Sequence, residues 1–214
     1  MLVIVDYEVG NIGSILNMLK FLQIPAVASR DPETLRGASR LLLPGVGAFD
    51  AGVSLLRKHD LIGVLDECVR ERRVPVLGIC LGMQLLTRGS EEGVLPGLGW
   101  IDAECRRFTK DRDPKGAMKV PHMGWNVAKP TTTERGLFKD MVQETRFYFV
   151  HSYHAVCVNP EDVAATTPYF GSFVSSVARD HVLGAQFHPE KSHRFGMKLL
   201  QNFVAFEPAR ELAS

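Results

Sequence analysis

One cysteine stands between two glycines in the stretch VPVLGICLGMQLL, behind an apolar run and ahead of a helix-like pattern. The pentapeptide GICLG around Cys80 has the G-x-nucleophile-x-G layout of a sharp turn from a strand into a helix. Such a turn strains the middle residue and exposes its side chain above the carboxyl end of a sheet, where the helix dipole favours a thiolate. The pattern predicts a nucleophile at Cys80; the alternative is a small buried cysteine in an ordinary turn.

A cysteine nucleophile needs a base, and the base needs a third group to orient it. Among the seven histidines, the segment GAQFHPEKS singles out His188, because it follows a strand-like run and Pro189 ends the backbone pairing. In an extended segment, residues two apart point the same way, so Glu190 can hold one ring nitrogen of His188 while the other faces the thiol. His-Pro-Glu alone is more often a turn at a strand end. The cysteine turn earlier in the chain favours a catalytic pair.

The third component of such a site is an oxyanion hole. The segment LLLPGVGAF follows a strand-like run with two glycines and no bulk, and neighbouring parallel strands would place it beside Cys80. Gly45, Val46 and Gly47 form a peptide segment free to turn an N–H toward a developing oxyanion, with the N–H of Leu81 as the second donor. The competing interpretation, a phosphate-binding loop, lacks the GxxxxGK[ST] pattern.

These side chains require a sheet whose strands end together. Apolar runs separated by helix-like periodicity predict a parallel sheet covered on both faces. Asn11 and Asp60 stand where they can cap two of the helices. Strands are predicted at residues 2–7, 26–29, 40–45 and 74–79, with helices over 12–22, within 50–73 and after Cys80.

The second half of the chain changes character. Four segments read as strands without helices between them, which predicts a mixed or antiparallel extension of the sheet: WIDAECRRF, RFYFVHSYHAV, SFVSSVA and HVLGAQFH. An amphipathic helix is expected over residues 193–206, and a mobile loop over 109–117. The expected fold is a single α/β domain over residues 1–214, with a central, mostly parallel (mixed) sheet flanked by helices.

Composition excludes several classes of protein. The formal charge is +1, from 25 basic and 24 acidic side chains, so neither nucleic acid nor an anionic membrane is an expected partner. Apolar runs stay below the roughly 18 to 20 residues of a membrane span. The four cysteines show neither CxxC spacing nor a paired histidine pattern for zinc, so no metal site is expected. A reduced, cytoplasmic compartment is the expected setting.

The motifs PGVG, GICLGMQ and QFHPEKS occur in this order, and in this respect the sequence resembles the class I (triad-type) glutamine amidotransferases. The resemblance covers essentially the whole chain and implies a flavodoxin-like fold. It implies that Cys80 attacks the carboxamide of L-glutamine and forms a glutamyl thioester, with His188 as general acid and base and Glu190 as its orienter. It also implies that Gln84, Ser152 and Tyr153 contact the glutamine, and that no cofactor is needed.

Three further motifs, IVDYEVGNI, KVPHMGWN and FYFVHSYH, resemble the glutaminase subunits of imidazole glycerol phosphate synthase. The resemblance implies a heterodimer in which this chain docks on a (β/α)8-barrel synthase that receives the ammonia. The chain ends soon after its last predicted helix, so ammonia is expected to pass to another polypeptide. The resemblance places these residues at or near the interface: Asn11, Met123, Trp125, Asn126 and Lys191.

Residues 8–14 and the ending KSHRFGMKLL depart from the histidine-pathway pattern. They resemble a paralogous branch encoded with surface-polysaccharide genes, which delivers ammonia to an acetamido sugar. The triad is common to both branches, so the acceptor stays open. Two alternatives from other classes are a cysteine peptidase or stress-response protein and a non-catalytic regulatory subunit. The first would not need HSY or PHMGWN, and the second predicts a missing triad residue.

Overall fold

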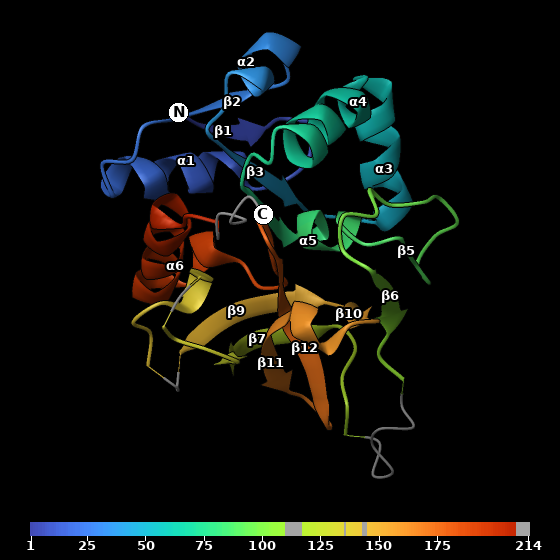
Figure 1. Cartoon of the computed structure of the whole chain (residues 1–214). Coiled ribbons are helices and arrows are strands. Elements are labelled where there is room, and N and C mark those ends of the chain that lie inside the picture. Colours follow the sequence, from blue (N-terminus) through green and yellow to red (C-terminus); the bar gives the residue numbers. More distant parts are fainter. Residues whose placement is uncertain (110–116, 135, 143–144, 209–214) are drawn as a thin grey trace, which may run out of the picture.

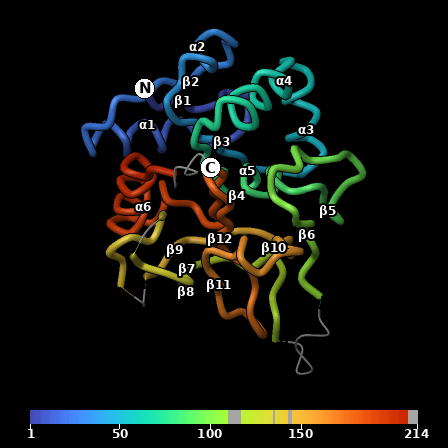
Figure 2. The backbone as a smooth tube through the Cα atoms, viewed as in Figure 1, coloured from blue at the N-terminus to red at the C-terminus, as the bar shows by residue number. Residues whose placement is uncertain are grey.

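The computed structural model describes residues 1–109, 117–134, 136–142 and 145–208 (Figures 1 and 2). The predicted loop at 109–117 lies almost wholly outside the described residues. The α-helices are α1 (Ile12–Phe21), α2 (Pro32–Arg36), α3 (Phe49–Lys58), α4 (Leu61–Asp66), α5 (Leu81–Leu85) and α6 (His193–Ala205). Short helices are the π-helix η1 (Glu67–Glu71) and the 3-10 turns η3 (Gly136–Phe138), η4 (Pro160–Asp162) and η5 (Pro189–Lys191).

The strands alternate with these helices in the first half and follow one another in the second. They are β1 (Leu2–Val5), β2 (Ala26–Ser29), β3 (Arg40–Gly45), β4 (Val76–Cys80), β5 (Gly89–Ser90), β6 (Ala103–Arg107), β7 (His122–Val127), β8 (Lys129–Pro130), β9 (Arg146–His151), β10 (Tyr153–Cys157), β11 (Val163–Pro168), β12 (Ser172–Arg179) and β13 (Val182–Ala185). All four strands predicted in the first half are present, as is the closing helix.

The main sheet has two parts. Its strands run in the order β2-β1-β3-β4-β13-β12-β10-β6-β5, with β11 on β12 and β8 on β11. The strands from β2 to β13 are parallel, whereas β12, β10 and β6 follow in antiparallel order. The prediction of an α/β fold with a mixed sheet is therefore confirmed.

Helices cover both faces of the parallel part of the sheet, with α2 to α5 on one face and α1 and α6 on the other (Figures 1 and 2). Side chains of β1 alternate between the two layers: Val3 and Val5 belong to the core cluster on the side of α2 to α5, while Leu2 and Ile4 belong to the cluster on the side of α1 and α6. Because both faces are buried, the strand is a continuous apolar run, which is why it was predictable.

A second, two-stranded sheet was not predicted. β7 and β9 pair antiparallel beside the main sheet, whereas β10 belongs to the main sheet. The segment RFYFVHSYHAV, expected as one strand, therefore breaks at Ser152, whose carbonyl accepts the N–H of Phe108 at 3.0 Å. The PHMGWN segment lies mostly in β7.

The two predicted helix caps are correct in position and wrong in mechanism. Asn11 and Asp60 occupy the N-cap positions of α1 and α4, but neither side chain caps the helix. Asp60 has a left-handed backbone, and the Asn11 side chain accepts a hydrogen bond from the Ser14 hydroxyl instead. Within the described part of the chain, no helix is long and apolar enough to cross a membrane.

Candidate active site

Three adjacent parallel strands bring the predicted motifs together. β4 lies between β3 and β13, and Gly45 at the end of β3 stands in register with Cys80 at the end of β4. β13 ends at Ala185, three residues before His188. The carboxyl ends of parallel strands share one edge of the sheet, so residues 35 and 108 positions from Cys80 in sequence become its neighbours.

Cys80 adopts the strained conformation that the pentapeptide predicts. Its backbone φ is 54° and its ψ is −110°, values that a residue with a Cβ rarely adopts. A Cβ at Gly78 would lie 2.7 Å from the carbonyl oxygen of Gly82, and one at Gly82 would overlap the carbonyl of Leu43. Both glycines are therefore required for the turn. The following helix, α5, is only five residues long.

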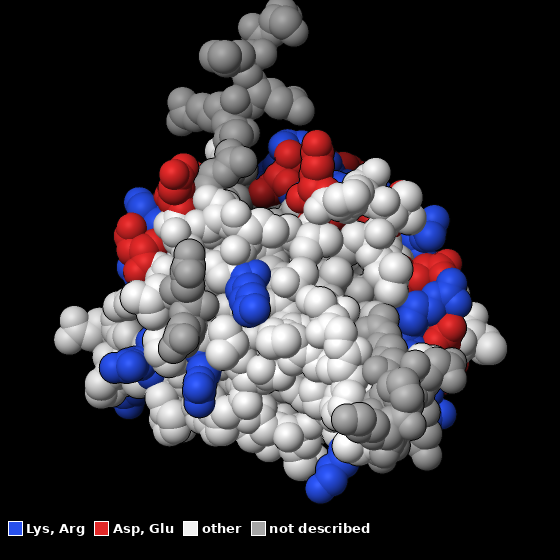
Figure 3. Space-filling view, turned by 90° about the horizontal axis from the view of Figure 1, so that it is seen from below, with Lys and Arg blue, Asp and Glu red and all other residues white. Residues whose placement is uncertain are grey.

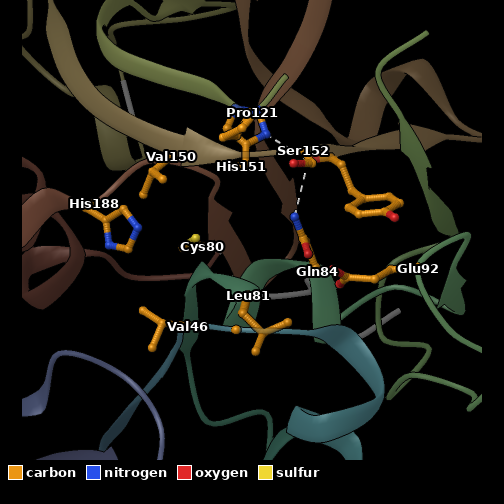
Figure 4. Close-up of a pocket in the computed structure, with 12 residues that line it drawn as sticks. Val46, Cys80, Leu81, Gln84, Glu92, Pro121, Val150, His151, Ser152 and His188 are labelled. Atoms are coloured by element: carbon orange, nitrogen blue, oxygen red, sulfur yellow. Dashed lines mark hydrogen bonds between the residues drawn. The ribbon is translucent and has the colours of Figure 1, made fainter. Parts of the chain in front are cut away.

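His188 and Glu190 form the predicted pair. Nδ1 of His188 donates to Oε1 of Glu190 at 2.8 Å, and both side chains are almost fully buried. The other ring nitrogen, Nε2, has no hydrogen-bond partner among the described residues and faces Cys80 (Figure 4). The backbone differs from the prediction: residues 189–191 form a 3-10 turn rather than an extended segment, and the contact is made nonetheless.

The pKa of His188 favours the charged ring. Burial alone would lower it, but interactions with the facing thiol of Cys80 and with Glu190 outweigh burial and raise the pKa to about 9. A buried imidazolium between a sulfur and a carboxylate is the arrangement that supports a thiolate nucleophile. The amide of Gln186 lies 3.9 Å from the sulfur of Cys80 as a weak donor.

The predicted oxyanion segment borders the same cavity. Val46, Gly47 and Leu81 line it, whereas Gly45 is not part of the lining. A Cβ at Gly45 would lie 2.5 Å from the Tyr7 hydroxyl and 2.9 Å from Cβ of Leu81, so its lack of a side chain serves packing. Gly47 has a φ of +102°, the conformation that glycine tolerates best.

The cavity above Cys80 has a volume of about 310 Å³. The three residues expected to contact glutamine, Gln84, Ser152 and Tyr153, all line it, and Figure 4 labels the first two. The Gln84 amide donates to the carbonyl of Tyr153 at 3.2 Å and to the Gln186 side chain at 3.1 Å. The complete lining is Val46, Gly47, Cys80, Leu81, Gln84, Glu92, Pro121, Val150, His151, Ser152, Tyr153 and His188.

Glu92 is a charged member of this lining that the sequence did not single out. It belongs to an ordinary-looking acidic loop, and no motif marks it. Its Oε2 accepts the backbone N–H of Phe49 at 2.8 Å, which fixes the carboxylate at the cavity wall.

Two of the predicted interface residues, Trp125 and Lys191, contact the same aromatic ring, that of Tyr148. Trp125 stacks on His193 with ring centroids 5.4 Å apart, and it makes an edge contact with Tyr148. Lys191 lies over the Tyr148 ring, 5.7 Å from its centroid. Asn11 lies beside the triad, with its amide 3.5 Å from Oε1 of Glu190.

Met123 and Trp125 point outward from β7, 62% and 47% exposed. Asn126 differs from them, because its side chain turns inward. Its amide nitrogen donates to the carbonyl of Pro168 at 2.9 Å and lies 3.2 Å from Nε2 of His122. Tyr148 and His193, which contact Trp125, were not predicted.

The other cysteines lie where burial was expected. Cys68 and Cys105 are buried and Cys157 is half-buried, and all are free thiols. Burial raises the pKa of Cys105 to about 12 and that of Cys157 to about 11, so neither provides a thiolate at neutral pH.

Comparison with known proteins gives a consistent result. A family model described as "Glutamine amidotransferase class-I" matches residues 3–206. Imidazole glycerol phosphate synthase subunit HisH 2 of Pseudomonas aeruginosa is 52% identical over 95% of this chain and 98% of its own. The protein of the same description from Methanococcus maripaludis is 46% identical over the same shares. A crystal structure of a glutamine amidotransferase superposes with a TM-score of 0.71 at 20% identity, covering 95% of this chain and 97% of its own, which shows a shared fold. The chain belongs to the class-I glutamine amidotransferase family.

Proposed function

We propose that this chain is the glutaminase subunit of an imidazole glycerol phosphate synthase. It hydrolyses L-glutamine with Cys80, His188 and Glu190 and passes the ammonia to a (β/α)8-barrel synthase subunit. One observation carries the proposal. A buried His188, oriented by Glu190 at 2.8 Å, faces a cysteine held in a strained turn at the floor of a cavity of about 310 Å³.

In the first half-reaction, the Cys80 thiolate attacks the carboxamide carbon of glutamine. The oxygen becomes negative and is stabilised by N–H groups of the 45–47 segment and of Leu81. The carbon–nitrogen bond then breaks as the His188 imidazolium gives its proton to the leaving nitrogen. The products are ammonia and a glutamyl thioester on Cys80.

In the second half-reaction, neutral His188 takes a proton from a water molecule that attacks the thioester. The carbon–sulfur bond breaks, glutamate leaves with the oxygen of water, and the second proton of that water passes to solvent. The thiolate and the imidazolium are thereby restored together. Glu190 keeps Nδ1 of His188 protonated throughout, so that Nε2 is the atom that exchanges the proton.

The cavity wall suits the amino-acid end of glutamine. Glu92 places a carboxylate where it would pair with the α-ammonium group. Gln84, Ser152 and the Tyr153 backbone supply hydrogen-bonding groups on the same wall. Every group needed for the reaction is a side chain or a peptide of this chain, so the proposed chemistry uses no cofactor.

The docking surface for the synthase is proposed to consist of Asn11, Met123, Trp125, Tyr148 and Lys191. An exposed tryptophan and methionine beside a tyrosine and a lysine have the composition of an interface centre with a charged rim. β7 and β9 lie at the lower end of the molecule in Figure 1. Seen from below, the described residues at that end form a broad area of uncharged side chains, with few acidic side chains among them (Figure 3). Two relatives are named as subunits of a synthase, which supports a synthase partner for this chain.

Docking is proposed to control the oxyanion hole. The peptide between Gly45 and Gly47 would rotate to direct an N–H into the cavity when the partner and its substrate are bound. Gly47 gives this segment its freedom, and Val46 is 42% exposed, so its side chain does not hold the segment in place. Without that rotation, glutamine hydrolysis would stay slow and little glutamine would be wasted.

The decisive experiment compares Cys80→Ser with the natural chain in complex with the barrel subunit. We expect the variant to lose synthesis from glutamine while the complex still works with added ammonium salts. Glutamine turnover that survives the substitution would refute the assignment of Cys80.

The acceptor is tested with the same complex. Stimulation of glutamate release by the phosphoribulosyl imidazole-pathway substrate supports the histidine-pathway subunit. The segments at 8–14 and 191–200 motivate a second candidate, an acetamido sugar of surface-polysaccharide synthesis. Stimulation by that sugar alone would contradict the histidine-pathway assignment and leave the glutaminase chemistry in place.

A further inference from the structure

Two buried histidines, not used by the chemistry described above, touch each other beside the cavity. His122 on β7 and His151 on β9 stand opposite each other in register. Nδ1 of His122 lies 3.0 Å from Nε2 of His151, and both residues are buried. His151 also lines the cavity above Cys80 (Figure 4). The pair therefore connects the outer strand β7 to the glutamine pocket.

The contact between His151 and Tyr153, at the pocket, fixes which atom donates in each hydrogen bond of the pair. Nδ1 of His151 lies 2.7 Å from the carbonyl oxygen of Tyr153, which only accepts, so this nitrogen donates. In a neutral ring Nε2 of His151 is then an acceptor, and Nδ1 of His122 must donate to it. This leaves Nε2 of His122 as an acceptor.

The same direction follows independently from the other end. Oδ1 of Asn126 accepts the backbone N–H of Val127 at 2.8 Å, which fixes the orientation of the amide. Its nitrogen therefore points at the Pro168 carbonyl and at Nε2 of His122, 3.2 Å away, where it donates. Both ends thus require a proton on Nδ1 of each histidine.

The surroundings keep both rings neutral. Burial lowers the pKa of His122 to about 4 and that of His151 to about 3. Aromatic rings surround the pair, with Phe108 5.3 Å from His151 and Tyr169 4.2 Å from His122 between ring centroids. At neutral pH each ring carries one proton, so the chain of hydrogen bonds has a single arrangement.

The chain of hydrogen bonds ends at the carbonyl oxygen of Tyr153, in the wall of the pocket. The Tyr153 carbonyl that accepts from His151 also accepts from Gln84, and the two bonds converge there (Figure 4). Gln84 in turn holds Gln186, whose amide lies against the sulfur of Cys80. A shift of the Tyr153 peptide would therefore move the wall proposed to bind glutamine.

We propose that His122 and His151 are positioning residues: with Asn126 they form a directed chain of hydrogen bonds from the proposed docking strand to the Tyr153 carbonyl in the glutamine pocket. This chain of hydrogen bonds sets the affinity for glutamine, whereas Cys80 and His188 carry out the chemical step. This inference rests on the proposed function for its effect on glutamine, but its proton arrangement is independent of any activity.

The proton arrangement is tested by nitrogen-15 NMR of the histidine side chains in the natural chain. His122 and His151 are expected as neutral Nδ1–H tautomers. His181 is an internal control, because its Nε2 contacts the Val69 carbonyl at 2.7 Å and it should be the Nε2–H tautomer. An Nε2–H tautomer or a charged ring at His122 or at His151 at neutral pH would overturn the proposal.

The effect on glutamine is tested with two variants in complex with the barrel subunit. His122→Asn keeps an N–H near the Nδ1 position, whereas His122→Leu leaves Nε2 of His151 buried without a donor. We expect the leucine variant to raise KM for glutamine at least about threefold, with kcat within twofold of the natural chain, and the asparagine variant to restore most of that KM.

An unchanged KM in the leucine variant, or equal KM values in both variants, would refute the positioning role. If the leucine variant does not fold, the tautomers of the natural chain still decide. A natural complex that lacks glutaminase activity would overturn the proposed function instead, and it would leave the NMR result to be judged on its own.

Discussion

Replacing Glu190 by glutamine tests how the carboxylate supports the base. The carboxylate accepts from Nδ1 of His188 at 2.8 Å with both side chains almost fully buried. Glu190→Gln keeps the shape and removes the charge. It also offers an amide that can present an N–H to the ring and reverse its tautomer.

The magnitude follows from the pKa of His188. The rise from 6.5 to about 9 corresponds to about 3 kcal/mol, at about 1.4 kcal/mol per pH unit. Cys80 and Glu190 both raise the pKa against burial, so removing the carboxylate removes part of this energy. Each loss of about 1.4 kcal/mol from the transition state lowers kcat about tenfold, and we expect a loss of at least that size. A reversed ring would lower it further, since loss of the correct tautomer costs on the order of 10⁴-fold in serine triads.

The assay is kcat for glutamine as a function of pH in the complex with the barrel subunit. The imidazolium is present below its pKa, so the natural chain should lose activity as pH rises through about 9. In Glu190→Gln the pKa falls and this alkaline decline moves to lower pH. Glu161→Gln, at an exposed carboxylate, is the matched control and should behave as the natural chain. A Glu190→Gln variant with unchanged kcat and an unmoved decline would refute the reasoning.

Three further changes probe the turn, the core and the docking surface. Gly82→Ala should abolish soluble folded protein, because its Cβ would overlap the Leu43 carbonyl. Gly63→Ala, whose Cβ would meet nothing within 4 Å, should fold normally by circular dichroism. A folded Gly82→Ala chain would contradict the need for glycine. Tyr7→Phe should raise the free energy of unfolding by about 1 kcal/mol in urea titration, because the buried hydroxyl has no partner among the described residues; a loss of similar size would mean that the hydroxyl is hydrogen-bonded. Trp125→Ala should weaken binding to the barrel subunit at least about tenfold, measured by calorimetry. Phe21→Ala, at a 73% exposed side chain, should leave Kd unchanged. Equal effects of the two substitutions would rule out the proposed surface.

The parallel half of the sheet was predictable because its strands are buried on both faces. β3 was predicted with its observed bounds, and the pairing of Gly45 with Cys80 follows from parallel neighbours ending together. The contact of His188 with Glu190 was also predicted, although the backbone between them is a 3-10 turn. Short-range sequence pattern was sufficient wherever a strand end defines the position of a side chain.

Features set by tertiary contacts were not predictable. The break at Ser152 depends on Phe108 reaching its carbonyl from another strand, and Glu92 enters the cavity by holding the N–H of Phe49. Asn11 stands at a helix start, yet its side chain contacts Ser14 and Glu190 rather than capping the helix. Each of these depends on a partner that local composition does not identify.

The central claim is that Cys80 is the nucleophile, and the most direct measurement is mass spectrometry of the acid-quenched complex during glutamine turnover. We expect a γ-glutamyl group on the peptide that contains Cys80, lost on incubation at neutral pH and absent when Cys80 is replaced by serine. Steady turnover with no such adduct, or with the adduct on another residue, would contradict it.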